Sequence, residues 1–155
     1  MPRPSRQQIH NHAVALVKLE LVERGMDVPP YVFTSSMLDI GYQTPKDELV
    51  NVKVKARTSG SWQHDTESGF VDFVIDHLRW VFVDLADPDP SFSIVPDTIV
   101  KTHLAEKRRK SSIARTRGSR VTIDESLVDR WSNRWDLLTG SKLWPLLGGM
   151  TTGTS

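Results

Sequence analysis

The chain of 155 residues contains no cysteine. This absence excludes disulfides, zinc sites with thiolate ligands, iron–sulfur clusters and cysteine nucleophiles, so a metal ion would have to be held by oxygen or imidazole ligands. Magnesium-type chemistry, with oxygen ligands, is the simplest remaining expectation. The sequence also lacks an apolar run of the roughly 20 residues that span a bilayer, and its first residues, MPRPSRQQ, have no apolar signal core. We therefore predict a cytoplasmic protein with no membrane partner.

Two further motifs are missing, namely a glycine-rich phosphate loop and a serine-centred nucleophile elbow. The sequence IHNH places two histidines two residues apart on a predicted helix, where they point in nearly opposite directions and cannot chelate one metal ion together. The common nucleotide-binding and hydrolase signatures therefore do not describe this chain.

Charge is distributed unevenly along the sequence, although the formal net charge is only +1. Residues 61–100 hold eight acids and one base, Arg79, whereas residues 101–120 hold eight bases and one acid, Glu106. Three explanations are open: each segment is a solvated surface, the two neutralise one another in the fold, or the second, a basic loop at about 106–121, binds a polyanion.

Hydrophobic spacing predicts the secondary structure. Apolar residues recur at helical intervals over residues 6–24, and short β-rich runs follow at 28–33, 37–42 and 49–56, which we interpret as a meander. Strands are predicted at 80–85 and 92–95, and a helix capped by Asp97 is predicted from Thr98 towards Lys107. Residues 63–79 give no clear pattern.

A last amphipathic helix is predicted behind Asp124, because Leu127, Trp131, Trp135 and Leu138 recur at helical spacing. That spacing favours buried packing anchors for Trp131 and Trp135 over a platform for stacking bases. The expected fold class is α/β, with a mixed central sheet flanked by helices, in one domain of residues 1–140 followed by a flexible tail at 141–155.

The most informative segment is VNVKVKA, in which side chains alternate between the two faces of a strand. The valines should face the core, while Lys53 and Lys55 share the opposite face with Asn51. Asp39 lies across the preceding hairpin and can face the lysines. This combination of one acid and two lysines is a candidate site.

These residues resemble the PD-(D/E)XK nuclease superfamily, which has the fold of restriction endonucleases and Holliday-junction resolvases. The resemblance rests on a helix ending LELVERG, on LDIGY at the start of a strand, on KVK in the position of an acid-x-lysine motif, and on ARTSGSW. The segments VFVDL, IVP and RWDLL are similar to those of a subgroup of small bacterial proteins and extend the resemblance to about residue 138.

The resemblance implies an endonuclease in which Asp39 is the first acid and a ligand of Mg²⁺, while Lys55 is the catalytic lysine that orients the attacking water. Lys53 stands where the second acid of the family belongs, and Val14 aligns with a helix position that often carries glutamate. An ammonium group cannot coordinate a metal ion. Two interpretations follow: a divergent Mg²⁺-dependent endonuclease, or a metal-free relative in which Lys53 takes the place of the ion and the protein binds nucleic acid or a protein partner.

Nucleic acid, DNA in particular, is the predicted partner, and a homodimer is one expected assembly. The residues predicted to contact phosphates are Lys53, Arg57, Lys107, Arg108, Arg109, Lys110, Arg115 and Arg117.

Overall fold

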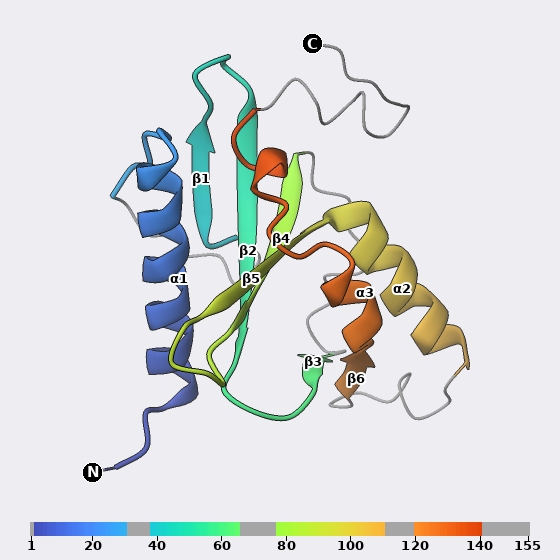
Figure 1. The fold of residues 1–155 in the computed structure, drawn as a ribbon. Helices are drawn as coiled ribbons and strands as arrows, with labels where there is room; N and C mark the ends of the chain where they lie inside the picture. The colour runs from blue at the N-terminus through green and yellow to red at the C-terminus, as the bar shows by residue number, and fades with distance from the viewer. Residues whose placement is uncertain (1, 31–37, 66–76, 111–119, 141–155) are drawn as a thin grey trace.

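The computed structural model describes residues 2–30, 38–65, 77–110 and 120–140. Its elements follow the chain in the order shown in Figure 1. They are α1 (Arg6–Glu23), β1 (Ile40–Gln43), β2 (Leu49–Arg57), β3 (Trp62–Asp65), β4 (Leu78–Asp84), β5 (Ser91–Pro96), α2 (Asp97–Lys110), β6 (Arg120–Ile123), α3 (Glu125–Asp129) and the 3₁₀ turn η4 (Trp135–Leu137). The predicted tail at 141–155 lies outside the described residues.

Helix α1 confirms the helix predicted at residues 6–24. It begins with a capping box, in which the Ser5 side chain accepts from the backbone N–H of Gln8 and the Gln8 side chain accepts from the backbone N–H of Ser5. It ends before Gly25, whose positive φ of 91° suits glycine. Its buried face is formed by Ala13, Val17 and Leu21, the spacing expected of an amphipathic helix.

A four-stranded sheet in the order β1-β2-β4-β5 forms the centre of the molecule. Strand β2 pairs antiparallel with β1 and parallel with β4, and β4 pairs antiparallel with β5. The sheet is therefore mixed, as predicted. Strands β1 and β2 confirm the predicted runs at 37–42 and 49–56, whereas residues 28–30 of the first run form no strand and residues 31–33 lie outside the described residues.

Both faces of the sheet are covered. Helix α1 and the end of the described chain pack on the face that carries Val52, Val54 and Val81, whereas α2, α3 and a second small sheet cover the face that carries Trp80 and Phe82. The small sheet is an antiparallel pair of β3 and β6, with Trp62 opposite Ile123. Two apolar cores, one on each side of the central sheet, hold these layers together.

The basic segment begins as a helix. The sequence predicted a basic loop from about residue 106, but α2 continues to Lys110, so Lys107, Arg108, Arg109 and Lys110 form its last turn. Cations at this end of a helix interact favourably with its macrodipole. Arg115 and Arg117, the other residues of the predicted loop that were expected to bind nucleic acid, lie outside the described residues.

The predicted last helix is shorter than its spacing suggested. Helix α3 ends at Asp129, and the chain then pairs with the edge of β5 through an isolated bridge between Ser132 and Ser93. A positive φ of 56° at Asn133 is incompatible with a continuous helix. Trp135 is nonetheless buried, with 4% of its surface exposed, and Trp131 is partly buried against both cores, so both tryptophans are packing residues as predicted.

None of the described helices is both long enough and apolar enough to cross a membrane.

Candidate functional site

Asp39 lies immediately before β1, whose pairing with β2 begins with Ile40 opposite Val52. Its backbone N–H donates to the carbonyl of Val52 over 2.8 Å, which continues the β1–β2 ladder by one bond. The next hydrogen bond to β2 is made by the Asp39 side chain and not by the backbone. Its Oδ2 accepts from the N–H of Val54 over 2.7 Å. The carboxylate is therefore held at the edge of β2, beside the two lysines.

The other carboxylate oxygen contacts helix α1. Oδ1 of Asp39 accepts a hydrogen bond of 2.8 Å from Nε2 of His10. The Asp39 side chain is 13% exposed and the His10 side chain 31% exposed, so the pair lies at the rim of the interior rather than within it. An imidazole is therefore the group of α1 that contacts Asp39.

His10 was not identified from the sequence. The resemblance places the helix position of the site at Val14, which in the structure packs against the core formed with α1. His10 lies one helical turn earlier on the same face, because residues four apart are neighbours on a helix. The signal that could have indicated the pair was a histidine one helical turn before the aligned position 14, on the helix expected to contribute to the site of Asp39.

Lys53 and Lys55 occupy the same face of β2, as the alternation predicted. They lie opposite Trp80 and Phe82 of β4, and both are half-buried. Burial lowers the pKa of Lys53, while the negative charge of Asp39 acts in the opposite direction and favours the ammonium form. The structure thus brings Asp39 and Lys53 close enough to interact electrostatically.

A groove of about 480 Å³ opens beside this cluster. It lies between the first turns of α1, the second half of β2, the 58–61 loop, β3 and the first residue of β6. Its described lining includes no acid, but it contains six basic or imidazole side chains: Arg6, His10, Lys53, Lys55, Arg57 and Arg120. The groove is therefore positively charged.

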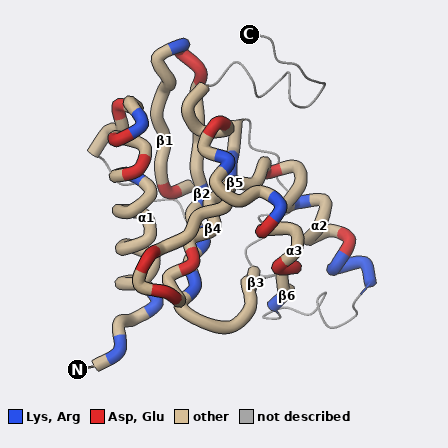
Figure 2. Tube along the Cα trace, in the orientation of Figure 1, with Lys and Arg blue, Asp and Glu red and all other residues tan. Residues whose placement is uncertain are grey.

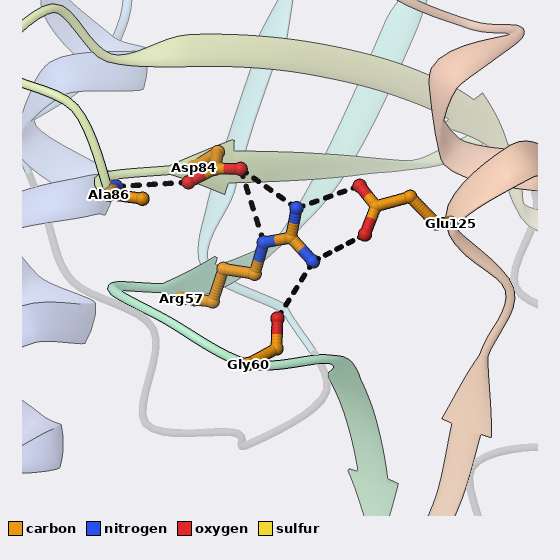
Figure 3. Close-up of polar contacts among 5 residues, drawn as sticks. All are labelled: Arg57, Gly60, Asp84, Ala86 and Glu125. Atoms are coloured by element: carbon orange, nitrogen blue, oxygen red, sulfur yellow. Dashed lines mark hydrogen bonds and ion pairs between the residues drawn. The ribbon is translucent and has the colours of Figure 1, made fainter.

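Arg57 differs from the other cations of the groove because its guanidinium is fully engaged with protein oxygens (Figure 3). Its five N–H groups donate to Asp84, Glu125 and the carbonyl of Gly60, with distances from 2.7 to 3.1 Å. The hydrogen bonds with Glu125 and then those with Asp84 raise the pKa of Arg57. A phosphate would have to compete with these five bonds, so direct nucleic-acid binding by Arg57 stays a prediction.

The groups around Asp39 differ from those of the Mg²⁺ site that the resemblance implies. One oxygen of Asp39 accepts from His10 and the other from Val54, and Lys53 adds an ammonium group at the position of the expected acid. In the described part of the chain, no three histidine or acidic side chains gather closely enough to hold a metal ion. These residues do not fit a Mg²⁺ site, which normally uses several oxygen ligands.

The basic turn of α2 is separate from the groove. Among the described residues that line the groove, none comes from α2. Figure 2 shows the basic end of α2 on the side of the molecule opposite α1. Lys107 pairs with Asp124 at 2.7 Å and Arg109 with Glu106 at 2.9 Å, so part of this charge is balanced within the protein.

Neither a protein-family model nor a curated protein sequence matches this chain. Among solved structures, that of a bacterial homing endonuclease superposes with a TM-score of 0.57, covering 88% of this chain and 95% of the other at 13% sequence identity. At this identity the likeness concerns the fold, and the protein therefore has a nuclease-like α/β fold with a mixed central sheet.

Proposed function

We propose that the protein binds nucleic acid through the backbone phosphates, in the groove beside Asp39. The observation that supports this proposal is the charge of the groove, whose described lining combines several cations with no acid. The fold is that of a nuclease, and the superposed bacterial homing endonuclease belongs to a class of proteins that act on nucleic acid.

Four cations of the groove are suited to phosphate contacts. Lys53 and Lys55 form its half-buried floor, while Arg6 at the start of α1 and Arg120 at the start of β6 are exposed at its sides. Lysine and arginine contacts to phosphates supply most of the affinity of sequence-independent binding. The presence of these residues around one groove therefore suits a nucleic-acid backbone.

The groove favours duplex DNA over an unpaired strand. Its only described aromatic residue is Trp62, which is 3% exposed and covered by the guanidinium of Arg57 at 4.3 Å from the ring centroid. Proteins that bind single strands generally stack bases on exposed aromatic rings. Without such a ring, contacts to the backbone dominate, and these are available on a duplex.

The decisive experiment compares Lys53→Ala/Lys55→Ala with Lys46→Ala, a control in the exposed β1–β2 turn. Binding of a short fluorescein-labelled DNA duplex is measured by anisotropy over a series of salt concentrations. The double variant should bind more weakly, and its log–log salt dependence should be shallower by about 2 units, because two phosphate contacts are lost. If the double variant instead binds as Lys46→Ala does at every salt concentration, the groove is not the binding site.

A Mg²⁺-dependent endonuclease is the second candidate. It is supported by the position of Asp39 just before β1, with its carboxylate held at the edge of β2 near Lys55, in a nuclease-like fold. It would require metal ligands in addition to the described residues around Asp39. This activity would be established if the parent protein cleaves DNA in the presence of Mg²⁺ and both Asp39→Ala and Lys55→Ala lose that cleavage. Binding without cleavage under the same conditions would favour the binding function alone.

A further inference from the structure

The groove is assembled from segments that are distant in sequence. Lys53 and Lys55 belong to β2 in the central sheet, whereas Gln63 and Arg120 belong to β3 and β6 of the small sheet. No strand pairing joins the two described sheets. Their relative placement, and with it the width of the groove, therefore depends on the short 58–61 connection between β2 and β3 and on side-chain contacts.

Arg57 contacts four segments at this junction: the end of β4, the 58–61 loop, β3 and the start of α3. It is the last residue of β2 and lies opposite Asp84, the last residue of β4, in the parallel register. Its guanidinium also binds Glu125, the first residue of α3, and the carbonyl of Gly60 in the 58–61 loop, as Figure 3 shows. Its planar face covers Trp62 of β3.

We propose that Arg57 is a positioning residue for the groove: it sets the β3–β6 wall relative to the lysines of β2 without contacting nucleic acid itself. This inference rests on the proposed binding function. The planar guanidinium suits the role because it binds carboxylates in a fixed bidentate geometry, which a lysine ammonium cannot reproduce.

The charges around Arg57 support positioning over direct contact. Asp84 and Glu125 place two carboxylates against one guanidinium, so the immediate surroundings of Arg57 carry an excess of negative charge. A phosphate that approached Arg57 would be repelled by both acids and would have to displace bonds of 2.7 and 2.8 Å.

The test removes Glu125, whose side chain is 54% exposed, so the variant should fold. Glu125→Ala is compared with Asp129→Ala, which removes the same charge from an exposed position on the same helix without touching Arg57. If Arg57 binds phosphate, loss of Glu125 frees its guanidinium and removes a repelling charge, so the labelled duplex should bind more tightly. If Arg57 positions the wall, Glu125→Ala should bind at least about threefold more weakly, a factor that corresponds to about 0.6 kcal/mol.

Arg57→Lys provides the second measurement because it keeps the charge and loses the bidentate geometry. We expect it to weaken binding to a similar extent, and the double variant Arg57→Lys/Glu125→Ala to be no weaker than either single variant, since both disrupt one contact. Tighter or unchanged binding by Glu125→Ala relative to Asp129→Ala overturns the positioning role. That result would leave the proposed function intact as long as Lys53→Ala/Lys55→Ala loses affinity, whereas unchanged binding by the lysine variant refutes the function itself.

Discussion

Replacing Lys53 by glutamate tests whether the ammonium group of Lys53 takes the place of a metal ion beside Asp39. The substitution puts a second carboxylate beside Asp39, whose Oδ1 already accepts from His10 Nε2 at 2.8 Å. The variant would then bring two carboxylates and an imidazole to one place, a set that can hold Mg²⁺ or Mn²⁺. In the parent, the ammonium of Lys53 interacts with Asp39 instead, so we expect no stabilisation by either ion.

The size of the effect follows from linkage. A metal ion present at ten times its dissociation constant stabilises the folded state by about 1.4 kcal/mol. For a domain of this length, 1 kcal/mol shifts the melting temperature by roughly 2–4 °C, so the variant should melt about 3–6 °C higher with the ion than without it. Without metal, two neighbouring carboxylates repel one another, and the variant should be less stable than Lys53→Gln, which removes the charge without adding an acid.

Differential scanning fluorimetry with and without Mn²⁺, followed by isothermal titration calorimetry, provides the measurement. Lys53→Gln controls for the loss of the lysine, and Asp39→Ala/Lys53→Glu controls for the new ligand set, so neither should respond to the ion. Metal binding requires deprotonated ligands, and the response of Lys53→Glu should therefore weaken as the pH falls through the range in which carboxylates and imidazole protonate.

Two results would refute this reasoning. One is a parent protein that is itself stabilised by Mg²⁺ and loses that response in Asp39→Ala, because Lys53 would then not replace the ion. The other is a Lys53→Glu variant that folds but shows no metal response beyond that of Lys53→Gln, because position 53 would then not face the Asp39 carboxylate.

Two other predictions concern packing and charge. Trp135→Ala should lower the free energy of unfolding by about 3–5 kcal/mol in urea denaturation, as expected for a buried aromatic residue. Trp135 packs against Phe92 with ring centroids 5.2 Å apart. An unchanged midpoint accompanied by lost nucleic-acid binding would contradict that packing role. If the end of α2 extends the interface, replacing Arg108, Arg109 and Lys110 by alanine should make the log–log salt dependence of duplex binding shallower by up to about 3 units. Anisotropy titrations that match the parent at every salt concentration would show that this turn only stabilises its helix.

Local patterns predicted the elements whose residues alternate or recur regularly. The valines of β2 and the apolar stripe of α1 follow single periodicities, and both elements formed within a few residues of the predicted bounds. The pairing of β3 with β6 could not be predicted, since it joins Trp62 to Ile123 across 61 residues and neither strand is longer than four residues. Short strands give little pattern, and long-range pairing is decided by packing.

Charge and aromatic spacing were misleading in two places. The bases at 107–110 suggested a loop, but lysine and arginine are good helix formers and are stabilising at a helix C-terminus, so α2 includes them. Trp131 and Trp135 are four residues apart, yet the backbone between them turns at Asn133 and hydrogen-bonds to β5. The prediction of buried tryptophans was confirmed because burial follows from hydrophobicity. The predicted helix begins after Asp124 as expected, but its length was wrong because spacing alone does not determine the backbone.

At the site, the face of β2 that carries the lysines could be predicted from the sequence, whereas the contact of Asp39 with α1 could not. Alternation along β2 placed Lys53 and Lys55 on one face, but the partner of Asp39 on α1 is 29 residues earlier in the chain and comes into contact only because the helix packs beside β2. With His10 bound to one oxygen and the charge of Lys53 nearby, the Asp39 carboxylate is balanced by protein groups. The described acids beside the groove also include Asp84 and Glu125, and all three are bound by its lining residues His10 and Arg57. The five lysines and arginines of the described lining outnumber these acids, so a polyanion could bind there without a metal ion. This is the physical reason for placing nucleic-acid binding, rather than metal-dependent cleavage, first among the proposed functions.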